Sequence, residues 1–288
     1  MSVYNGRPFL ETAVESVLDQ TFTDFEFIII DDGSTDGSSE ILRRHAAQDD
    51  RIRLFDQENI GITPSINRGL RKTRGEYIAR MDADDVSLPA RFEKQVAYLE
   101  NHPDCVALGG QVRLIDKNGR PVRNANSPPY SDDEGRMKGL WEDHELIEKD
   151  LLEGEWPIQQ SASMLRRDAV EQIGGYDERF ATNQDHDLFL KLAEVGRLAN
   201  LQETVVKYRR HPEQVTADQS GRNFEIEYRK AKIRREAYLR RDCPLPDELR
   251  LTSLVGLLLR RGLSKTALWP YIQTAWGTFR GRIGSDLE

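Results

Sequence analysis

The sequence predicts an α/β fold built on a mostly parallel sheet that helices flank. Strand-like and helix-like segments alternate throughout residues 1–110, as in consecutive strand–helix–strand units. Residues 25–30 form a nearly continuous apolar run, which is typical of a strand buried on both faces of a parallel sheet, and residues 77–81 are an apolar run rich in strand formers. Both runs end abruptly in aspartates, and an open α/β sheet presents its ligand-binding residues at this edge.

Periodicity and turn chemistry place the other elements of this half. Pro8 suits a first helical position, and apolar residues after it repeat with helical period to about residue 20. A short strand is expected at 52–55. Two further helices are expected to begin at a capping residue followed by proline, at Thr63-Pro64 and at Ser87-Leu-Pro89.

Beyond residue 105 we expect a small antiparallel element, two more strands and several helices. Strands at 106–109 and 112–115 are predicted to lead into a hairpin turn at Asn118-Gly119. Further strands are expected at 161–165 and 205–208, and helices at 140–152, 169–173 and 185–195. From residue 222 onward the pattern indicates a helical extension.

Composition indicates a globular protein, and we expect no nucleic-acid partner. Of 288 residues, 38% are hydrophobic and 31% charged, unlike a disordered or membrane-spanning chain. The net charge is −8, but residues 222–241 hold eight Lys or Arg and three Glu, a local charge of +5, so the remainder carries −13. A solvated helix face is the expected role of this basic segment, and a peripheral contact with anionic lipid is the alternative.

Cysteine usage and apolar stretches bear on the compartment. Cys105 and Cys243 show neither metal nor redox spacing, so we expect a reducing, cytoplasmic location, with the inner face of the membrane as the site of any lipid contact. No signal peptide is visible, and the longest apolar stretch, at 254–259, is too short to cross a bilayer. Residues 1–4 have the character of a strand end, so we expect a first strand that has lost its beginning.

The acidic stretch after residue 81 is the first candidate site. Asp82 and Asp84 are two apart and share a face if the chain is extended there, whereas Asp85 points elsewhere. Clustered carboxylates repel one another unless a cation lies among them. The alternative is a solvated acidic turn in which Asp84 or Asp85 caps a helix. This stretch alone leaves both interpretations open.

The chain resembles the family 2 glycosyltransferases with the GT-A fold. The matching stretches occur in the family's order and cover about residues 1–215. They are Val3-Tyr-Asn-Gly6, Phe25-Glu-Phe-Ile-Ile-Ile-Asp-Asp-Gly-Ser-Thr-Asp-Gly37, Glu58-Asn-Ile-Gly61, Asn67-Arg-Gly69, Gly75-Glu-Tyr-Ile-Ala-Arg-Met-Asp-Ala-Asp-Asp85, Gly174-Gly-Tyr-Asp177, Asp185-His-Asp-Leu188 and Tyr208-Arg-Arg-His211. The last quarter of the chain carries none of these motifs.

This resemblance implies a nucleotide-sugar donor, most readily a UDP-sugar, a divalent cation (Mn²⁺ or Mg²⁺), and a single displacement that inverts the anomeric centre. A cation on the diphosphate neutralises the charge that grows as it leaves. Asp84 matches the last acid of the family's Asp-x-Asp motif and is the expected metal ligand. Asp82 is expected toward the ribose or beside the metal. His211 matches a further ligand position, its alternative being a surface or capping histidine.

The resemblance also assigns donor-binding residues and a base. Asp31 and Asp32 are expected to accept hydrogen bonds from the nucleobase and ribose, because both groups are donors. Asp185 is expected to be the general base that takes the acceptor hydroxyl's proton; its alternative, with Asp187, is to stabilise a helix N-terminus. Gln184 departs from the Glu that precedes the family's base. The remaining expected donor contacts are Tyr4 on the base, Arg80 and Arg209 or Arg210 near the diphosphate, and Asn67.

Three parts are therefore expected: residues 1–110 for the nucleotide sugar, 111–215 for the acceptor and catalysis within the same GT-A domain, and 216–288 as a helical extension. The acceptor is expected to be a saccharide or lipid-linked saccharide, and the pathway surface polysaccharide synthesis. One rival is a catalytically silent GT-A-like nucleotide-binding or scaffold protein. The other is a sugar-nucleotide pyrophosphorylase, which normally needs a glycine-rich phosphate loop that this sequence lacks.

Overall fold

The computed structural model describes residues 1–123, 131–137, 139–212, 214, 223–246 and 249–250. The chain forms two compact units, Met1–Gln219 and Ser220–Glu288. In the second unit the structure describes α8 (Asn223–Arg240), on which Ala231, Ile233 and Ala237 are buried. The predicted helices beyond residue 250 lie outside the described residues. No helix in the described ranges is long and apolar enough to cross a membrane.

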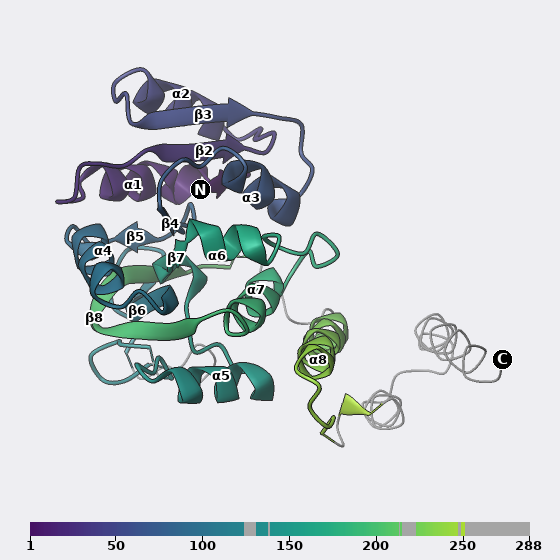
Figure 1. Ribbon diagram of the computed structural model, residues 1–288. Helices are drawn as coiled ribbons and strands as arrows, with labels where there is room; N and C mark the ends of the chain where they lie inside the picture. The colour runs from purple at the N-terminus through teal and green to yellow at the C-terminus, as the bar shows by residue number, and fades with distance from the viewer. Residues whose placement is uncertain (124–130, 138, 213, 215–222, 247–248, 251–288) are drawn as a thin grey trace. The chain divides into compact units, whose positions relative to one another are not determined.

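The first unit contains two sheets, and sheet A is entirely parallel (Figure 1). Its order is β1 (Ser2–Val3), β2 (Phe27–Asp31) and β3 (Ile52–Asp56). Every residue of β2 is buried, as its continuous apolar run predicts. The helices α1 (Arg7–Leu18) and α2 (Ser38–Ala46) pack on each other, and α3 (Ile62–Leu70) packs on β1 and β2.

Sheet B is mixed, with the strand order β4-β7-β6-β8-β5. Only the pair β6–β8 is parallel, and every other neighbouring pair is antiparallel. Its strands are β4 (Tyr77–Ala79), β5 (Val86–Ser87), β6 (Cys105–Asp116), β7 (Met164–Arg166) and β8 (Arg197–Arg210). The helices around it are α4 (Arg91–Asn101), α5 (His144–Glu153), α6 (Arg167–Gln172) and α7 (Gln184–Leu192), with a 3₁₀ turn at Gln160–Ala162.

The predicted α/β class, a parallel sheet with an antiparallel element, is confirmed, but the strand at 77–81 was placed in the wrong sheet. β4 does not continue the parallel sheet; it pairs antiparallel with β7 at one edge of sheet B. The apolar run 77–81 is only partly buried: Ile78 and Met81 are buried in the core, whereas Tyr77 and Ala79 are half-buried. An apolar run after a helix therefore did not show which sheet the strand joins, and β4 is an edge strand of sheet B.

Two glycines conceal the length of β6. The prediction of separate strands at 106–109 and 112–115 was wrong, because β6 runs without a break; its pairing with β8 shifts register between Cys105 and Ala107 and again around Gln111. A Cβ on Gly110 would lie 2.5 Å from Val205 Cγ2, and one on Gly109 would lie 2.0 Å from Asn200 Oδ1. The glycines are thus close-packing positions against β8 and not turn residues.

Both expected Ser/Thr caps were also wrong. α3 begins at Ile62 after Gly61, so Thr63 lies inside the first turn and donates its hydroxyl hydrogen bond to the Phe180 carbonyl at 2.7 Å. Ser87 lies in β5, where its backbone N–H donates to Ser16 Oγ at 3.0 Å. Both residues thus form hydrogen bonds with parts of the chain far away in sequence and do not cap a helix.

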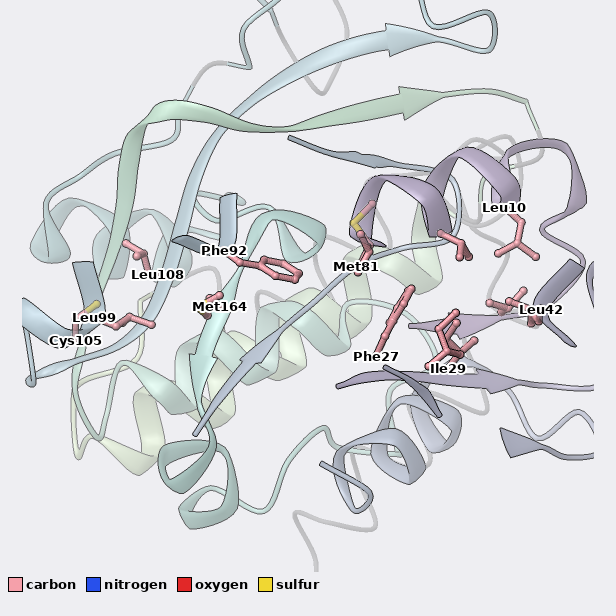
Figure 2. Close-up of a cluster of buried hydrophobic side chains, with 14 of the residues drawn as sticks. Leu10, Phe27, Ile29, Leu42, Met81, Phe92, Leu99, Cys105, Leu108 and Met164 are labelled. Atoms are coloured by element: carbon pink, nitrogen blue, oxygen red, sulfur yellow. The ribbon is translucent and has the colours of Figure 1, made fainter. Parts of the chain in front are cut away.

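One apolar core joins the two sheets (Figure 2). Leu10, Phe27 and Ile29 from the sheet A side continue through Met81, Phe92 and Met164 to Leu99 and Leu108 beside β6. These side chains are all at most 6% exposed. Because a close-packed interior deforms little, the strand ends of both sheets keep fixed positions relative to one another.

Candidate active site

The acidic loop, residues 80–85, links the two opposite edges of sheet B. It leaves β4 at one edge and enters β5 at the other, so it must pass the ends of the three strands between them. The chain turns at residues 83 and 84 and is not extended there, so Asp82 and Asp84 need not share a face. Each of the three aspartates has its own surroundings.

Asp84 faces His211, which directly follows β8. Asp84 Oδ2 and His211 Nε2 are 3.0 Å apart, and the histidine side chain is only 8% exposed. The His211 ring also lies against the Phe9 ring of α1, with 4.6 Å between ring centroids. Two of the residues predicted as metal ligands, 127 positions apart in the sequence, are thus brought into direct contact.

Asp82 pairs with Arg80, and its charge also acts on Asp185 in the first turn of α7. Arg80 Nη2 is 3.4 Å from Asp82 Oδ1, and Arg80 is nearly fully buried. Burial raises the pKa of Asp82, the Arg80 charge opposes that rise, and the Asp84 carboxylate adds to it. Half-buried Asp82 is the member of the acidic loop that connects the Asp84 side to the Asp185 side.

Asp185 stands in the first turn of α7, and its Oδ1 accepts a hydrogen bond from the His186 N–H at 2.9 Å. Burial raises the pKa of Asp185 to about 6; that hydrogen bond opposes the rise, and the Asp82 charge contributes to it. The next acid, Asp187, is fully buried in the first turn of α7 and pairs with Lys191 Nζ at 2.6 Å. Its expected role at the helix N-terminus stays a prediction. Asp185 therefore belongs to the same electrostatic cluster as Asp82.

Asp85 is part of the support under the site. It is fully buried, and its Oδ1 accepts a hydrogen bond from the Arg209 N–H at 2.8 Å. Burial, together with the Asp84 and Asp82 charges, raises its pKa well above the ordinary value. Asp85 does not cap α4, which was one interpretation of the acidic turn, because that helix begins after Ala90.

Arg91 and Tyr176 complete this support, and sequence reasoning assigned no role to either. The buried Arg91 guanidinium donates from Nη2 to the Arg80 carbonyl at 2.8 Å and to the Ser163 carbonyl at 3.0 Å. Burial lowers its pKa to about 9, and the Asp85 charge opposes that fall. Tyr176 lies under Arg80, with 6.0 Å from the guanidinium carbon to the ring centroid. The Gly174-Gly-Tyr-Asp177 motif was the available signal for Tyr176; nothing distinguished Arg91 from a surface arginine in a helix's first turn.

Asp31 and Asp32, at the end of β2, accept hydrogen bonds from neighbouring segments of sheet A's side of the chain. Asp31 accepts from the Ser34 N–H at 3.0 Å and from the Ser39 hydroxyl. Asp32 accepts from Gln57 Nε2 at 2.6 Å, and from the N–H groups of residues 60 and 61 at 2.9 and 3.0 Å. An ionised carboxylate offers about four acceptor positions, so capacity for a ligand remains at both residues. Their nucleoside-binding role stays a prediction.

The other predicted donor contacts differ in how free they are. Tyr4 is 55% exposed at the end of β1. Asn67 is buried, and all its polar atoms are used, since Oδ1 accepts from the Tyr176 N–H and Nδ2 donates to the Tyr176 carbonyl and to Glu178. Arg209 is 5% exposed and donates from Nε to the Asp84 carbonyl at 2.8 Å. The structure thus gives Asn67 and Arg209 roles in holding the site together, and their contact with a donor stays a prediction.

Gln184, the residue that departs from the family's pattern, is 6% exposed. Its Oε1 has no hydrogen-bond partner among the described residues. A buried carbonyl without a hydrogen bond costs free energy. The Gln184 side chain thus places an unused hydrogen-bond acceptor next to Asp185 in the sequence.

Comparison with known proteins identifies the class. Residues 1–174 match the family described as Glycosyl transferase family 2. The chain is 36% identical over 215 residues to the "Putative glycosyltransferase EpsE" of Bacillus subtilis, covering 73% of this chain and 71% of that protein. It is 30% identical over 216 residues to the "O-antigen biosynthesis glycosyltransferase WbnJ" of Escherichia coli, covering 73% and 78%.

Solved structures show the same fold. S. aureus TarS 1-349, in complex with UDP-GlcNAc, superposes with a TM-score of 0.65 at 17% identity, covering 93% of this chain and 73% of that chain. The mannosyltransferase PcManGT from Pyrobaculum calidifontis, in complex with GDP-Man and Mn²⁺, gives a TM-score of 0.55 at 18% identity, covering 96% and 79%. The fold is therefore that of the GT-A transferases, and the chain belongs to glycosyl transferase family 2.

Proposed function

We propose that this glycosyltransferase moves a sugar from a nucleotide-diphosphate donor, a UDP-sugar, to a hydroxyl of a saccharide or lipid-linked saccharide, with inversion. The observation that carries the proposal is the arrangement around Asp82. Asp84 meets His211 at 3.0 Å and its charge acts on Asp82, while the Asp82 charge acts on Asp185, whose pKa is raised to about 6. A charge-neutralising group and a proton acceptor are the two things that this reaction needs.

The Asp84–His211 pair fits a divalent cation, Mn²⁺ or Mg²⁺. Neighbouring ligand atoms of an octahedral ion with bonds of about 2.1 Å stand about 3 Å apart, and Asp84 Oδ2 and His211 Nε2 are 3.0 Å apart. Asp82 is the third predicted ligand: burial raises its pKa and the Asp84 charge adds to the rise, a repulsion that a cation would relieve. Among the described residues its carboxylate does not form a close three-ligand cluster with Asp84 and His211. When bound, the cation supplies Lewis-acid stabilisation of the departing diphosphate.

Asp185 is the proposed general base. A pKa of about 6 leaves the carboxylate mostly ionised at neutral pH, yet basic enough to take a proton from the attacking hydroxyl. The His186 N–H holds one of its oxygens at 2.9 Å, which orients the carboxyl group. Gln184 Oε1, which has no partner within the described residues, is suited to accept a hydrogen bond from a second hydroxyl of the same acceptor.

The donor end of the site uses sheet A. Asp31 and Asp32 retain acceptor capacity for the base and ribose, and exposed Tyr4 offers a ring for stacking on the base. Arg80, whose Nε has no partner among the described residues, is suited to a diphosphate oxygen. The TarS complex with UDP-GlcNAc is consistent with a uridine donor, and the PcManGT complex with GDP-Man makes a guanosine donor the alternative.

The pathway and the location belong to the same proposal. The relative WbnJ is named for O-antigen biosynthesis, and a 28% identical relative from Erwinia amylovora is named for amylovoran biosynthesis. We infer that this chain also acts in surface polysaccharide synthesis, in the cytoplasm at the inner face of the membrane. The basic segment 222–241 is the candidate for a peripheral contact with that face.

The test compares nucleotide binding in two variants that each lose one strand-end carboxylate. Wild type, Asp84→Asn and, as the matched control, Asp56→Asn are titrated with UDP with and without Mn²⁺ while thermal unfolding is followed. Asp56 is an exposed acid at the end of β3. UDP with Mn²⁺ is expected to stabilise wild type and Asp56→Asn, by about 2.7 kcal/mol at a hundredfold excess over Kd, and not Asp84→Asn.

An equal stabilisation of Asp84→Asn would remove the metal role from that residue. A panel of nucleoside diphosphates in the same assay identifies the base. Transfer from the matching nucleotide sugar to an oligosaccharide panel, with the anomeric configuration of the product read by NMR, then tests turnover and inversion. Nucleotide binding without transfer to any acceptor would favour the catalytically silent alternative.

A further inference from the structure

A cavity lies beside Arg209, the residue whose Nε donates to the Asp84 carbonyl of the acidic loop. It has a volume of about 370 Å³ and is formed by the start of α1, by β5, by the last part of β8 and by the turn after β6. Small-molecule sites in proteins range from about 300 to 1,000 Å³, so the cavity has the size of a binding site. Phe9, Lys117, Lys207 and Arg209 line it and are called the basic pocket here.

The basic pocket gathers three cations. Lys207 and Arg209 are two apart on β8 and share a face of the sheet, and Lys117 belongs to the turn that follows β6. Within the described ranges, no ion pair joins any of the three to a carboxylate, although many of the chain's other cations have one. The nearest carboxylates have other donors: Asp116 accepts from the N–H groups of residues 118 and 120, and Asp85 accepts from the Arg209 N–H. The three cationic side chains therefore keep their charge for a ligand of the pocket.

Arg209 is held so that part of its guanidinium is left over. Nε donates to the Asp84 carbonyl at 2.8 Å, and Nη1 donates to the carbonyls of residues 116 and 117 at 3.3 and 3.4 Å. The guanidinium carbon lies 4.6 Å from the centroid of the Phe9 ring. Nη2 has no hydrogen-bond partner among the described residues, so its donors remain for a ligand of the pocket that Arg209 lines.

We propose that the basic pocket binds a phosphate group. A fixed arginine with unused donors, flanked by two flexible lysines, matches the charge and the several acceptor oxygens of a phosphate monoester or diphosphate better than it matches a monovalent carboxylate. The phosphate comes either from a soluble metabolite or from a phospholipid headgroup. The chemistry of recognition is the same for both sources.

The same residues connect the basic pocket to the Asp84–His211 pair. The Arg209 N–H donates to Asp85 Oδ1 at 2.8 Å, while its Nε holds the Asp84 carbonyl. Phe9 contacts the Arg209 guanidinium, and its ring also lies 4.6 Å from the ring of His211. A phosphate bound to Arg209 would therefore contact the residue that already holds the acidic loop in place.

The experiment uses the full chain and inorganic phosphate as the probe. Thermal unfolding is measured in EDTA, which removes phosphate binding bridged by a metal, with chloride at matched ionic strength as the reference. The pocket variant is Lys117→Gln/Lys207→Gln. The control variant, Lys72→Gln/Lys149→Gln, removes the same charge from two exposed lysines, one over Phe55 and one beside Glu153.

Phosphate is expected to raise the Tm of wild type and the control variant and to leave that of the pocket variant unchanged. Equal rises in all three, or no rise in wild type, would overturn the proposal. Because no metal is present, this result does not depend on the proposed transfer reaction.

A second measurement separates the two sources of phosphate. Flotation is measured with vesicles of phosphatidylcholine containing phosphatidylglycerol. If wild type and the control variant float and the pocket variant does not, the pocket binds a lipid headgroup. If flotation is absent or the same in all three while the phosphate-dependent rise in Tm needs the lysines, the pocket binds a soluble phosphate. If the pocket variant floats as wild type does and its Tm also rises with phosphate as that of wild type does, the pocket binds neither a lipid headgroup nor a soluble phosphate.

Discussion

Two strand-end acidic clusters in this chain use their carboxylates in opposite ways. At the end of β2 in sheet A, Asp32 accepts three hydrogen bonds from donors between residues 57 and 61. In the acidic loop beside sheet B, Asp82, Asp84 and Asp85 lie close enough for each other's charges to raise the pKa values of Asp82 and Asp85. The first cluster shapes a loop, whereas the second holds a repulsion that a cation would relieve. Two adjacent aspartates in a sequence therefore do not show whether they hold a loop or repel one another. The hydrogen-bond donors around them in the structure do.

The largest expected effect is on catalysis. Asp185→Asn should lower the transfer rate by about 10²- to 10⁴-fold while leaving UDP binding unchanged, because it removes the proton acceptor only. In wild type, the rate is expected to rise with pH through about 6, as Asp185 loses its proton. Steady-state kinetics between pH 5 and 8 measures both.

Asp168→Asn is the matched control for that substitution. Asp168 stands in the first turn of α6 and accepts from the N–H of the following residue at 2.7 Å, as Asp185 does at 2.9 Å in α7. A control variant as slow as Asp185→Asn, or unchanged turnover in Asp185→Asn, would mean that the carboxylate serves the helix and not the reaction.

The second prediction breaks the comparison between the clusters directly. Asp32→Ala should destabilise the protein by about 2 kcal/mol, because it leaves three donors without their charged acceptor. Asp84→Ala, measured without metal, should change stability by less than about 0.5 kcal/mol, since the lost His211 contact is offset by reduced repulsion. Urea unfolding in EDTA at pH 7 gives both values, and equal losses would show that the two clusters are built alike.

The smallest expected effect concerns the stability cost of a raised pKa. The folded state favours protonated Asp185, because the pKa of this residue is raised on folding. Its contribution to the free energy of unfolding is therefore complete below about pH 4 and is lost as pH rises through about 6. The difference from the ordinary 3.8 corresponds to at most about 3 kcal/mol, and solvent at a half-buried side chain reduces it to about 1 kcal/mol. Asp185→Asn should therefore be about 1 kcal/mol more stable than wild type at pH 8 and equal to it at pH 4. A gap of constant size would point to a cause other than ionisation.

Sequence reasoning worked where local pattern and tertiary role coincide. The apolar runs that end in aspartate gave the α/β class and the acidic loop, and the order of short motifs gave the family. The proximity of Asp84 and His211 followed from the same reasoning, whereas the roles of these residues stay predictions.

It did not work where the decisive partner lies far along the chain. Arg91 binds the Ser163 carbonyl 72 positions away, and Asn67 binds residues 109 and 111 positions away. The expected strand ended at Gly109, because nothing near the two glycines in the sequence indicates the close approach of β8. The expected caps at Thr63 and Ser87 failed for the same reason, since a remote carbonyl and a neighbouring helix had taken their hydrogen bonds.

The connection between β6 and β7 has a consequence for how such enzymes diversify. β6 and β7 are adjacent, antiparallel strands, paired at Ala107 with Leu165 and at Leu108 with Met164, yet the chain makes a long excursion between them. Both ends of the excursion are fixed in one sheet, but its interior also supplies buried side chains, among them Ile147, Leu151 and Ile158. Its exposed positions can therefore be exchanged at little cost to the scaffold, whereas these core positions cannot. Exchanging only the exposed positions between relatives would test whether residues 111–215 bind the acceptor, as the family resemblance leads us to expect.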